Sequence, residues 1–392
     1  MQDDSPSHAR LNWPWLLFLL LVAIGAAFPL STLSMQESAP GVAMFRGNAA
    51  RTGVVSSAPG PGAPLVEQWR FRTGGPVLSS PAVVDGTVYI GSGGFKAEDT
   101  TLYAIDAASG IERWRFATKG SIWSSPAVAD GVVYVGSDDG ALYALNTEYG
   151  GLLWSLQTGG EVSSAPAVAG DTVYVGSFDG FLYAVEADSG RVRWRFQTAG
   201  QIFSSPAVAG NIVYVASKDG ALYAVAAGDG TLLWQFRTGG EIFSTPAVSG
   251  ERIFFGSNDG FLYALSAGDG AEIWRYDTGG RVFSSPAADG ATVYVGTLDG
   301  SLVALDAETG DERWRFATGA WVTSSPAIAG GAGSQTIYVG SQDHSLYAVD
   351  LTTGAGIGQF PTGDVVYSTP AIVDGVVYVG SQDGNVYAIG RE

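Results

Sequence analysis

The side chains that most often carry catalysis are scarce in this sequence. There is no cysteine, and the only histidines are His8 and His344. A Ser-His-Asp triad or a zinc site built from several His or Cys ligands therefore lacks enough members. Without cysteine, the chain also cannot form disulfides, attach a c-type haem or carry a lipid on an N-terminal Cys. His344 replaces a Gly found in equivalent turns, so we interpret it as a turn residue.

Carboxylates recur at regular spacing, which raises the question of calcium binding. Six of them follow the same local pattern: Asp139, Asp179, Asp219, Asp259, Asp299 and Asp383. Each stands next to a Gly in the same hairpin turn, and Asp-Gly is a pair that tight turns with positive φ prefer. We therefore interpret these aspartates as turn residues and expect no metal site.

The best candidate for recognition is a recurring loop of the form Thr-Gly-Gly-X-Val/Ile-Z, in which X and Z vary inside a fixed frame. Several Z residues are aromatic and several X residues are charged, a mixture typical of binding surfaces. The candidate binding residues are Trp123, Glu161, Gln201, Phe203, Glu241, Phe243, Arg281, Phe283, Trp321, Asp364 and Tyr367. The competing interpretation is that the Z side chains only pack on one another and fill the centre of the molecule.

These loops belong to an internal repeat, which indicates a solenoid, propeller or array. A Pro inside a Ser/Thr/Ala-Pro-Ala tripeptide marks each unit: Pro81, Pro126, Pro166, Pro206, Pro246, Pro286, Pro326 and Pro370. The interval is 40 residues in the middle of the array, 45 at its start and 44 at its end. The extra residues fall in loops, as expected when every unit keeps the same strand framework.

Each unit predicts four short antiparallel strands. In the third unit these are residues 162–169, 172–177, 181–186 and 191–197, separated by Gly- and Asp-containing turns. Four strands in about 40 residues is the pattern of a propeller blade. The last unit ends at its third strand, residues 385–389, and residues 65–71 can supply the missing fourth. We therefore expect an all-β, eight-bladed propeller over residues 65–392, closed by its N-terminal strand.

A tryptophan on the fourth strand is expected to dock each blade on the next. The set is Trp69, Trp114, Trp154, Trp194, Trp234, Trp274 and Trp314. The eighth slot holds Gly358, which predicts a weaker joint between the last two blades, compensated by Phe360. Arginines alternate with the tryptophans, and charge on an outer strand discourages edge-to-edge pairing.

The segment from Ala304 to Trp314 resembles the tryptophan-docking motif Ala-x-Asp-x-x-Thr-Gly-x-x-x-Trp of the PQQ-type, quinoprotein-like propeller family. The resemblance covers about residues 65–392. It implies either a dehydrogenase holding PQQ and calcium near the axis or a non-enzymatic relative. The dehydrogenases typically carry adjacent cysteines and long insertions, which this chain lacks. We therefore expect the non-enzymatic branch, without PQQ or calcium. A WD40 propeller has a similar period, but its Gly-His and Trp-Asp pairs are not found in register.

The N-terminal region predicts attachment to a membrane. Residues 13–30 carry no charge and are mostly apolar, and about 17–25 such residues suffice to span a bilayer as a helix. We expect a tail over residues 1–12, a transmembrane anchor or cleaved signal helix over 13–33, and a linker over 34–64. Arg10 before the apolar segment favours an extracytoplasmic propeller. Within the linker, residues 44–48 and 51–53 are less linker-like, and we expect them to dock.

The net charge of −18, without any basic cluster, argues against a nucleic-acid partner. We therefore expect a membrane-anchored binding or scaffolding module with a protein partner in the cell envelope. Its architecture would be similar to the propeller subunit of the outer-membrane β-barrel assembly machinery, although that subunit is typically a lipoprotein. The alternative functions are a PQQ-dependent dehydrogenase and an extracellular sensor or adhesion module. The alternative localisation is secretion, which would follow if the N-terminal segment is a signal peptide that is cleaved.

Overall fold

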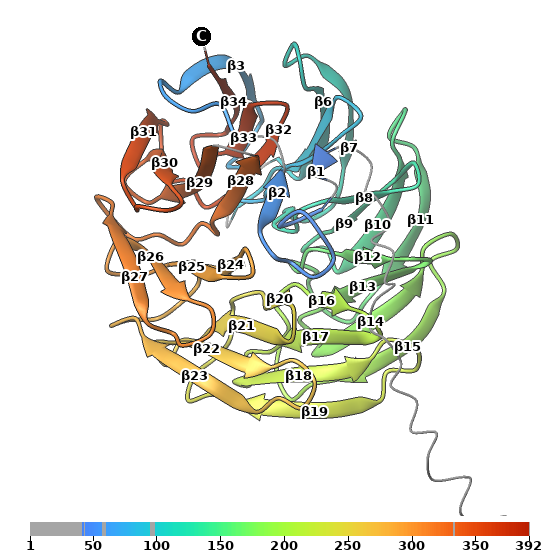
Figure 1. The fold of residues 1–392 in the computed structure, drawn as a ribbon. Helices are drawn as coiled ribbons and strands as arrows, with labels where there is room; N and C mark the ends of the chain where they lie inside the picture. Colours follow the sequence, from blue (N-terminus) through green and yellow to red (C-terminus); the bar gives the residue numbers. More distant parts are fainter. Residues whose placement is uncertain (1–40, 43, 57–59, 95–98, 332–333, 392) are drawn as a thin grey trace, which may run out of the picture. The chain divides into compact units, whose positions relative to one another are not determined.

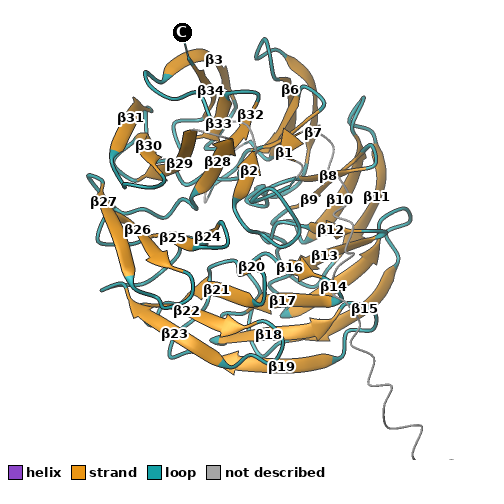
Figure 2. Cartoon of the chain, in the orientation of Figure 1, coloured by secondary structure: helices purple, strands orange, loops and turns teal. Residues whose placement is uncertain are grey.

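The structure is a computed structural model that describes residues 41–42, 44–56, 60–94, 99–331 and 334–391. Within these residues all regular structure is β, and eight sheets surround a central axis (Figure 1, Figure 2). Residues Ala39–Glu392 form one compact unit. The predicted eight-bladed propeller of four-stranded antiparallel blades is confirmed.

Within each blade the strands lie side by side, ordered from the axis outward. In the first seven blades this spatial order follows the order of the chain. Blades 1–4 contain β4 (Ala82–Val84), β5 (Thr87–Gly91), β6 (Thr101–Asp106), β7 (Glu112–Ala117); β8 (Ala127–Ala129), β9 (Val132–Gly136), β10 (Ala141–Asn146), β11 (Leu152–Gln157); β12 (Ala167–Ala169), β13 (Thr172–Gly176), β14 (Phe181–Glu186), β15 (Val192–Gln197); and β16 (Ala207–Ala209), β17 (Ile212–Ala216), β18 (Ala221–Ala226), β19 (Leu232–Arg237).

Blades 5–8 follow the same plan. Their strands are β20 (Ala247–Ser249), β21 (Arg252–Gly256), β22 (Phe261–Ser266), β23 (Glu272–Asp277); β24 (Ala287–Ala288), β25 (Thr292–Gly296), β26 (Ser301–Asp306), β27 (Glu312–Ala317); β28 (Ala327–Gly331), β29 (Ser334–Ser341), β30 (Ser345–Asp350), β31 (Gly356–Pro361); and β32 (Ala371–Val373), β33 (Val376–Gly380), β34 (Asn385–Gly390), with β3 (Val66–Arg72) as the outer strand.

The ring closes as the sequence predicts. Strand β3, from the start of the propeller, pairs antiparallel with β34 at its end, placing Trp69 opposite Ala388 and Arg72 opposite Asn385. In Figure 1 the blue β3 lies beside the dark red β34. Closure of this kind removes the two exposed edges that an open array of blades would leave.

Each docking tryptophan bonds to the following blade. Its indole Nε1–H donates to a carbonyl after the third strand of that blade, as from Trp154 to Ala187 at 2.9 Å. The glycine of the adjacent turn makes room for the ring: a Cβ on Gly190 would lie 2.7 Å from Trp154, and its φ is +72°. The other pairs are Trp69–Ala107, Trp114–Thr147, Trp194–Ala227, Trp234–Ala267, Trp274–Ala307 and Trp314–Leu351.

The joint between blades 7 and 8 lacks this tryptophan, because Gly358 occupies its slot. Leu65 fills the space, since a Cβ on Gly358 would lie 3.2 Å from Leu65 Cγ. Phe360 packs edge-on against Tyr387 with ring centroids 5.6 Å apart, but Phe71 and Tyr103 make the same contact elsewhere. Phe360 is therefore a regular member of the blade, and the compensating side chain is Leu65.

The interval expected to be a linker is largely docked on the propeller. Strand β1 (Gly41–Val42) pairs antiparallel with β4, and β2 (Val54–Ser56) pairs parallel with β28. Between them, four carbonyls accept backbone N–H bonds from the innermost strands of blades 4 to 7: Ala49 from Val208, Ala50 from Val248, Thr52 from Ala288 and Gly53 from Ile328. We call residues 44–56 the axial plug. The linker prediction is thus wrong here, whereas docking of residues 44–48 and 51–53 is confirmed.

The predicted helix over residues 13–33 lies outside the described residues. Among the described residues, no helix is both long enough and apolar enough to cross a membrane.

Candidate functional site

A cavity of about 770 Å³ lies on the propeller axis. Successive strands of a blade alternate in direction, so the loops between blades and the turns between second and third strands share one face. Both sets line the cavity, which therefore opens on that face. At its deep end stands the residue before each repeat proline: Ser80, Ser125, Ala165, Ser205, Thr245, Ser285, Ser325 and Thr369.

The deep end is a ring of residues, most of which are hydrogen-bonded to the next blade; the series is interrupted at Ala165, which has no hydroxyl. The backbone N–H of Ser205 donates to the hydroxyl of Thr245 at 3.1 Å, and Thr245 N–H donates to Ser285 at 3.0 Å. The ring also crosses the closure point, where Thr369 N–H donates to Ser80 at 2.8 Å. These hydroxyls are engaged in joining blades, so the repeated Ser/Thr-Pro serves ring assembly.

The axial plug closes the channel behind this ring with two fully buried arginines. Arg51 Nε donates to the carbonyl of Pro206 at 3.0 Å, and Arg51 Nη2 donates to Ala165 and Pro166 at 3.0 and 2.8 Å. Arg46 donates in the same way to the carbonyls of Ser285 and Pro286.

Both plug guanidinium groups are bound by carbonyl oxygens in a buried environment. Burial lowers the pKa of Arg51 to about 9, and burial together with the neighbouring Arg51 charge lowers the pKa of Arg46 to about 9. Their φ angles are +63° and +59°, a conformation that costs about 1–2 kcal/mol for a residue other than Gly. The carbonyl bonds offset this cost and hold Phe45 of the plug against the cavity.

Of the predicted binding residues, seven line the cavity: Trp123, Glu161, Phe203, Phe243, Phe283, Trp321 and Tyr367. Gln201, Glu241 and Arg281 are exposed on the same loops but outside the lining. The eleventh candidate, Asp364, lies one position away from the variable slot. Val365 accepts from Gln382 N–H at 3.0 Å, as Trp321 does from Gln342 at 2.9 Å, so Val365 occupies the X position.

The aromatic Z residues form an arc on one side of the cavity. Phe203 and Phe243 have ring centroids 5.5 Å apart, and Phe243 and Phe283 lie 5.4 Å apart. Phe178 extends the arc at 6.1 Å from Phe203. The rings do pack on one another, yet they leave the cavity open, and Trp321 at its mouth keeps 53% of its surface exposed. The Z side chains therefore pack on one another without filling the cavity.

A second variable position, which was not among the predicted binding residues, is the residue before each turn aspartate. Asp138, Phe178, Leu298 and Gln342 occupy it and line the cavity, and Lys218 occupies it in blade 4. The backbone N–H of this residue donates to the X residue of the adjoining loop, as from Lys218 to Gln201 at 2.9 Å. This residue varies between repeats while the surrounding Ser-x-Asp-Gly frame is largely constant, and that variation in the sequence could have identified it as a candidate binding position.

Charge in the cavity is concentrated at Asp138. Ser163 Oγ donates to Asp138 Oδ1 at 2.9 Å. Burial raises the pKa of Asp138 to about 6, with the charges of Glu161 and Asp139 adding to the effect. Lys218 instead donates to the side chain of Gln201 at 2.8 Å.

The turn aspartates bond within and between blades. Asp219 accepts from Ala221 N–H at 2.8 Å, from the Tyr223 hydroxyl at 2.7 Å and from Ala199 N–H at 2.8 Å. Most equivalents repeat this pattern. In the part of the chain that the structure describes, no three His, Cys, Asp or Glu residues gather as metal ligands.

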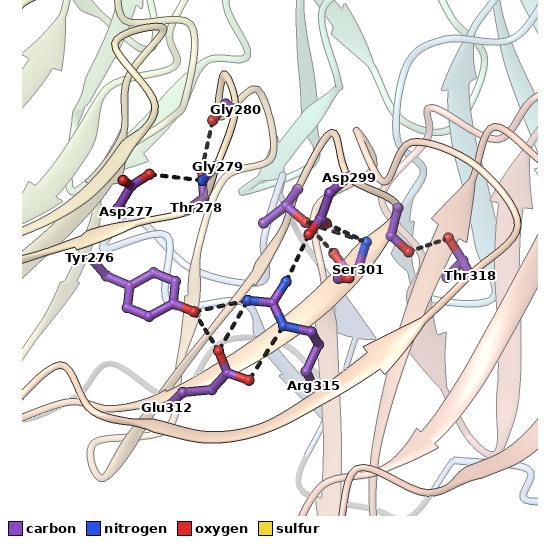
Figure 3. Close-up of polar contacts among 12 residues, drawn as sticks. Tyr276, Asp277, Thr278, Gly279, Gly280, Asp299, Ser301, Glu312, Arg315 and Thr318 are labelled. Atoms are coloured by element: carbon purple, nitrogen blue, oxygen red, sulfur yellow. Dashed lines mark hydrogen bonds and ion pairs between the residues drawn. The ribbon is translucent and has the colours of Figure 1, made fainter.

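Asp299 departs from this pattern, because Val303 replaces the tyrosine that its equivalents bind. Figure 3 shows Asp299 bonded to Arg315. Arg315 also contacts Glu312 on its own strand β27 and Tyr276 on β23 of the preceding blade. The Arg315 Nη1 to Asp299 Oδ2 distance is 2.8 Å. A local polar network thus replaces the regular contact at this joint.

The cavity does not suit PQQ, which is a quinone with three carboxylates. Among the described residues that line the cavity, none is Lys or Arg, and the charged ones are Asp138 and Glu161. Arg46 and Arg51 of the axial plug donate their N–H groups to main-chain carbonyls. These acidic side chains would repel the carboxylates of the cofactor, so the lining does not fit PQQ.

Comparison with known proteins places this geometry among PQQ-type propellers. A family model described as outer membrane protein assembly factor BamB matches residues 66–166 and 239–392. A second model, for the β-propeller of the beta-alanine-activating enzyme, matches residues 128–289. No curated protein matches the chain.

Solved structures share the fold at low sequence identity. BamB from Moraxella catarrhalis is 19% identical with a TM-score of 0.69, covering 83% of this chain and 100% of its own. Quinohemoprotein alcohol dehydrogenase from Comamonas testosteroni is 16% identical with a TM-score of 0.75, covering 89% and 80%. A europium-containing methanol dehydrogenase is 14% identical with a TM-score of 0.76, covering 90% and 98%. At such identities the likeness concerns the fold alone.

Proposed function

The chain belongs to the PQQ-type propeller family described as outer membrane protein assembly factor BamB, and from this membership we propose that it is a non-catalytic binding and scaffolding module of the cell envelope. The observation that carries the proposal is the one-sided cavity. Its mouth is formed by the positions that vary between repeats, and the axial plug closes its other end. A surface of this kind suits recognition of a partner rather than passage through the ring.

We infer that a protein partner contacts the mouth. Trp321 is the most prominent side chain there, with 53% of its surface exposed, and large aromatics are enriched among residues that dominate binding energy. Trp123 and Tyr367 contribute to the same lining. The apolar stretch of residues 13–30 would hold the chain at a membrane, with the propeller on the extracytoplasmic side.

Substitution at the mouth tests this role. Tagged full-length chain is recovered from the envelope fraction of its own cells, and co-purifying proteins are quantified for wild type, Trp123→Ala and Trp321→Ala. Ile273→Ala is the matched control, because Ile273 is exposed on the outer strand β23, away from the mouth. We expect both tryptophan variants to lose partners that Ile273→Ala keeps. Equal recovery in all variants would contradict the proposal.

Dehydrogenase activity is the alternative function, and likeness of fold to the quinoprotein enzymes is what supports it. Full-length chain is incubated with PQQ and calcium and assayed for dye-linked oxidation of alcohols and sugars. Turnover together with a quinone absorbance band would support dehydrogenase activity and contradict the scaffold role. A sensor or adhesion role would instead predict partners outside the cell. Whether the chain is anchored or secreted is a separate question. It is answered by identifying the N-terminal residue of the mature protein and by measuring how much of the protein is in the membrane fraction.

A further inference from the structure

The cavity holds a carboxyl group for which the described residues provide no cation. Asp138 is half-buried in the wall and accepts a hydrogen bond from Ser163 at 2.9 Å, but it takes part in no ion pair among the described residues. A buried charge normally has a partner of opposite sign, because desolvation without one is costly. An unpaired carboxylate facing a cavity is therefore suited to a cationic ligand.

The aromatic arc adds a second feature that favours a cation. Aromatic faces attract ammonium groups through the ring quadrupole, at distances within about 6 Å of the ring centroid. Lys218 already illustrates this attraction, since its Nζ lies 5.7 Å from the Phe178 centroid and 5.5 Å from that of Phe243. Lys218 Nζ also donates a hydrogen bond to the side-chain oxygen of Gln201. The arc thus holds an ammonium group at its rim.

The dimensions and surroundings fit a small organic molecule. A volume of about 770 Å³ lies within the range of about 300–1,000 Å³ typical of ligand pockets. Among the described residues, the charged side chains that line the cavity are Asp138 and Glu161, and Asp139, Glu241, Asp364, Lys218 and Arg281 stand on the adjoining turns and loops. Both charged residues of the lining are thus acidic, whereas Lys218 lies at the rim of the arc beside Phe178 and Phe243, and Arg281 lies outside the lining.

We propose that the cavity binds an organic cation, an ammonium group on an apolar body, with the ammonium at Asp138 and the apolar body along Phe178, Phe203 and Phe243. The scaffold role does not require such a ligand, so this inference goes beyond it. The ammonium could come from a free amine or from a lysine side chain of a partner, and the chemistry at Asp138 is the same for both.

Three probes with one apolar body and different charges test the proposal: 3-phenylpropylammonium, 3-phenylpropanol and 3-phenylpropionate. Their affinities for purified full-length chain are measured by isothermal titration calorimetry at pH 7.5. The cation should bind at least about tenfold more tightly than the alcohol, because a hydrogen bond between charged groups is stronger than one between neutral groups. The propionate should bind most weakly. Equal affinities, or no binding of the ammonium probe, would overturn the proposal.

Variants then assign the binding to Asp138. Asp138→Asn should weaken the cation about tenfold or more while leaving the alcohol within about twofold. Glu241→Gln is the matched control, because it removes one negative charge from the mouth outside the lining. An equal loss in both variants would indicate general charge attraction and contradict a site at Asp138. If Asp138→Asn does not fold, Phe203→Leu serves instead and should weaken the cation and the alcohol alike.

Two further arms complete the test. A peptide Gly-Gly-Lys-Gly-Gly and its norleucine counterpart distinguish the sources: binding of the lysine peptide points to a partner side chain, and binding of the free amine alone points to a small molecule. Affinity for the amine should also fall as the pH drops from 7.5 to 5, because Asp138 becomes protonated. A pH-independent affinity would count against the assignment.

Discussion

Arg51 and Pro206 lie 155 residues apart, yet the guanidinium Nε of one donates to the carbonyl of the other at 3.0 Å in the centre of the ring. The same guanidinium reaches Ala165 and Pro166 of the neighbouring blade. A segment that precedes the first blade thereby connects blades that are otherwise joined only at their sides. We conclude that the axial plug is a structural part of the propeller.

Arg51→Met should destabilise the protein substantially. The substitution keeps much of the apolar volume but leaves several buried carbonyls without a donor, each costing about 1–3 kcal/mol. We expect a loss of about 3–5 kcal/mol, measured by urea denaturation of the full chain. Arg70→Met is the control, since Arg70 is exposed and pairs with Glu67 at the outer edge, a type of pair that contributes about 0–1 kcal/mol. Similar losses for both variants would contradict a structural plug.

Trp194→Ala should weaken one blade joint. It removes the indole packing and the 2.9 Å bond to Ala227, with an expected loss of about 3–5 kcal/mol. Leu65→Ala, at the joint without a tryptophan, should cost less because a half-buried leucine packs less surface. Differential scanning calorimetry of the two variants compares the joints. A larger loss at Leu65 would show that the ring depends most on its irregular joint.

The repeated features of the fold were predictable from sequence, because each of them depends on neighbouring residues within one unit. Trp154 and Gly190 recur in a fixed frame, and so their contact recurs. The plug was not predictable in detail, since Arg51 binds main-chain carbonyls, which have no sequence signature. Asp138 was overlooked because its turn was interpreted only through the adjacent Asp-Gly pair. The register of Asp364 was misjudged because an Asp replaces the second Gly of its loop.

Asp138→Asn should stabilise the protein at neutral pH. The pKa of Asp138 is raised to about 6 in the folded state, above its value of about 3.9 when unfolded, so the folded state binds the proton more tightly. Its ionisation therefore lowers stability as the pH rises from about 4 through 6. With a discount for partial exposure, the cost at pH 7 is about 1–2 kcal/mol.

Thermal unfolding at two pH values measures this effect. The Tm of Asp138→Asn should exceed that of wild type at pH 7.5 and match it at pH 4. Asp139→Asn is the adjacent control, because Asp139 accepts bonds from Tyr143 and Lys119 N–H and its loss should destabilise at neutral pH. A lower Tm for Asp138→Asn at pH 7.5 would mean that the carboxylate stabilises the fold.

Site-specific photo-crosslinking in living cells tests the central claim, that the cavity mouth is the working surface. A photoreactive phenylalanine analogue replaces Trp321 at the mouth or Ile273 at the outer edge, two positions of similar exposure, 53% and 44%. We predict that a discrete crosslinked partner forms from position 321 and not from 273. Crosslinks confined to position 273 would contradict the account.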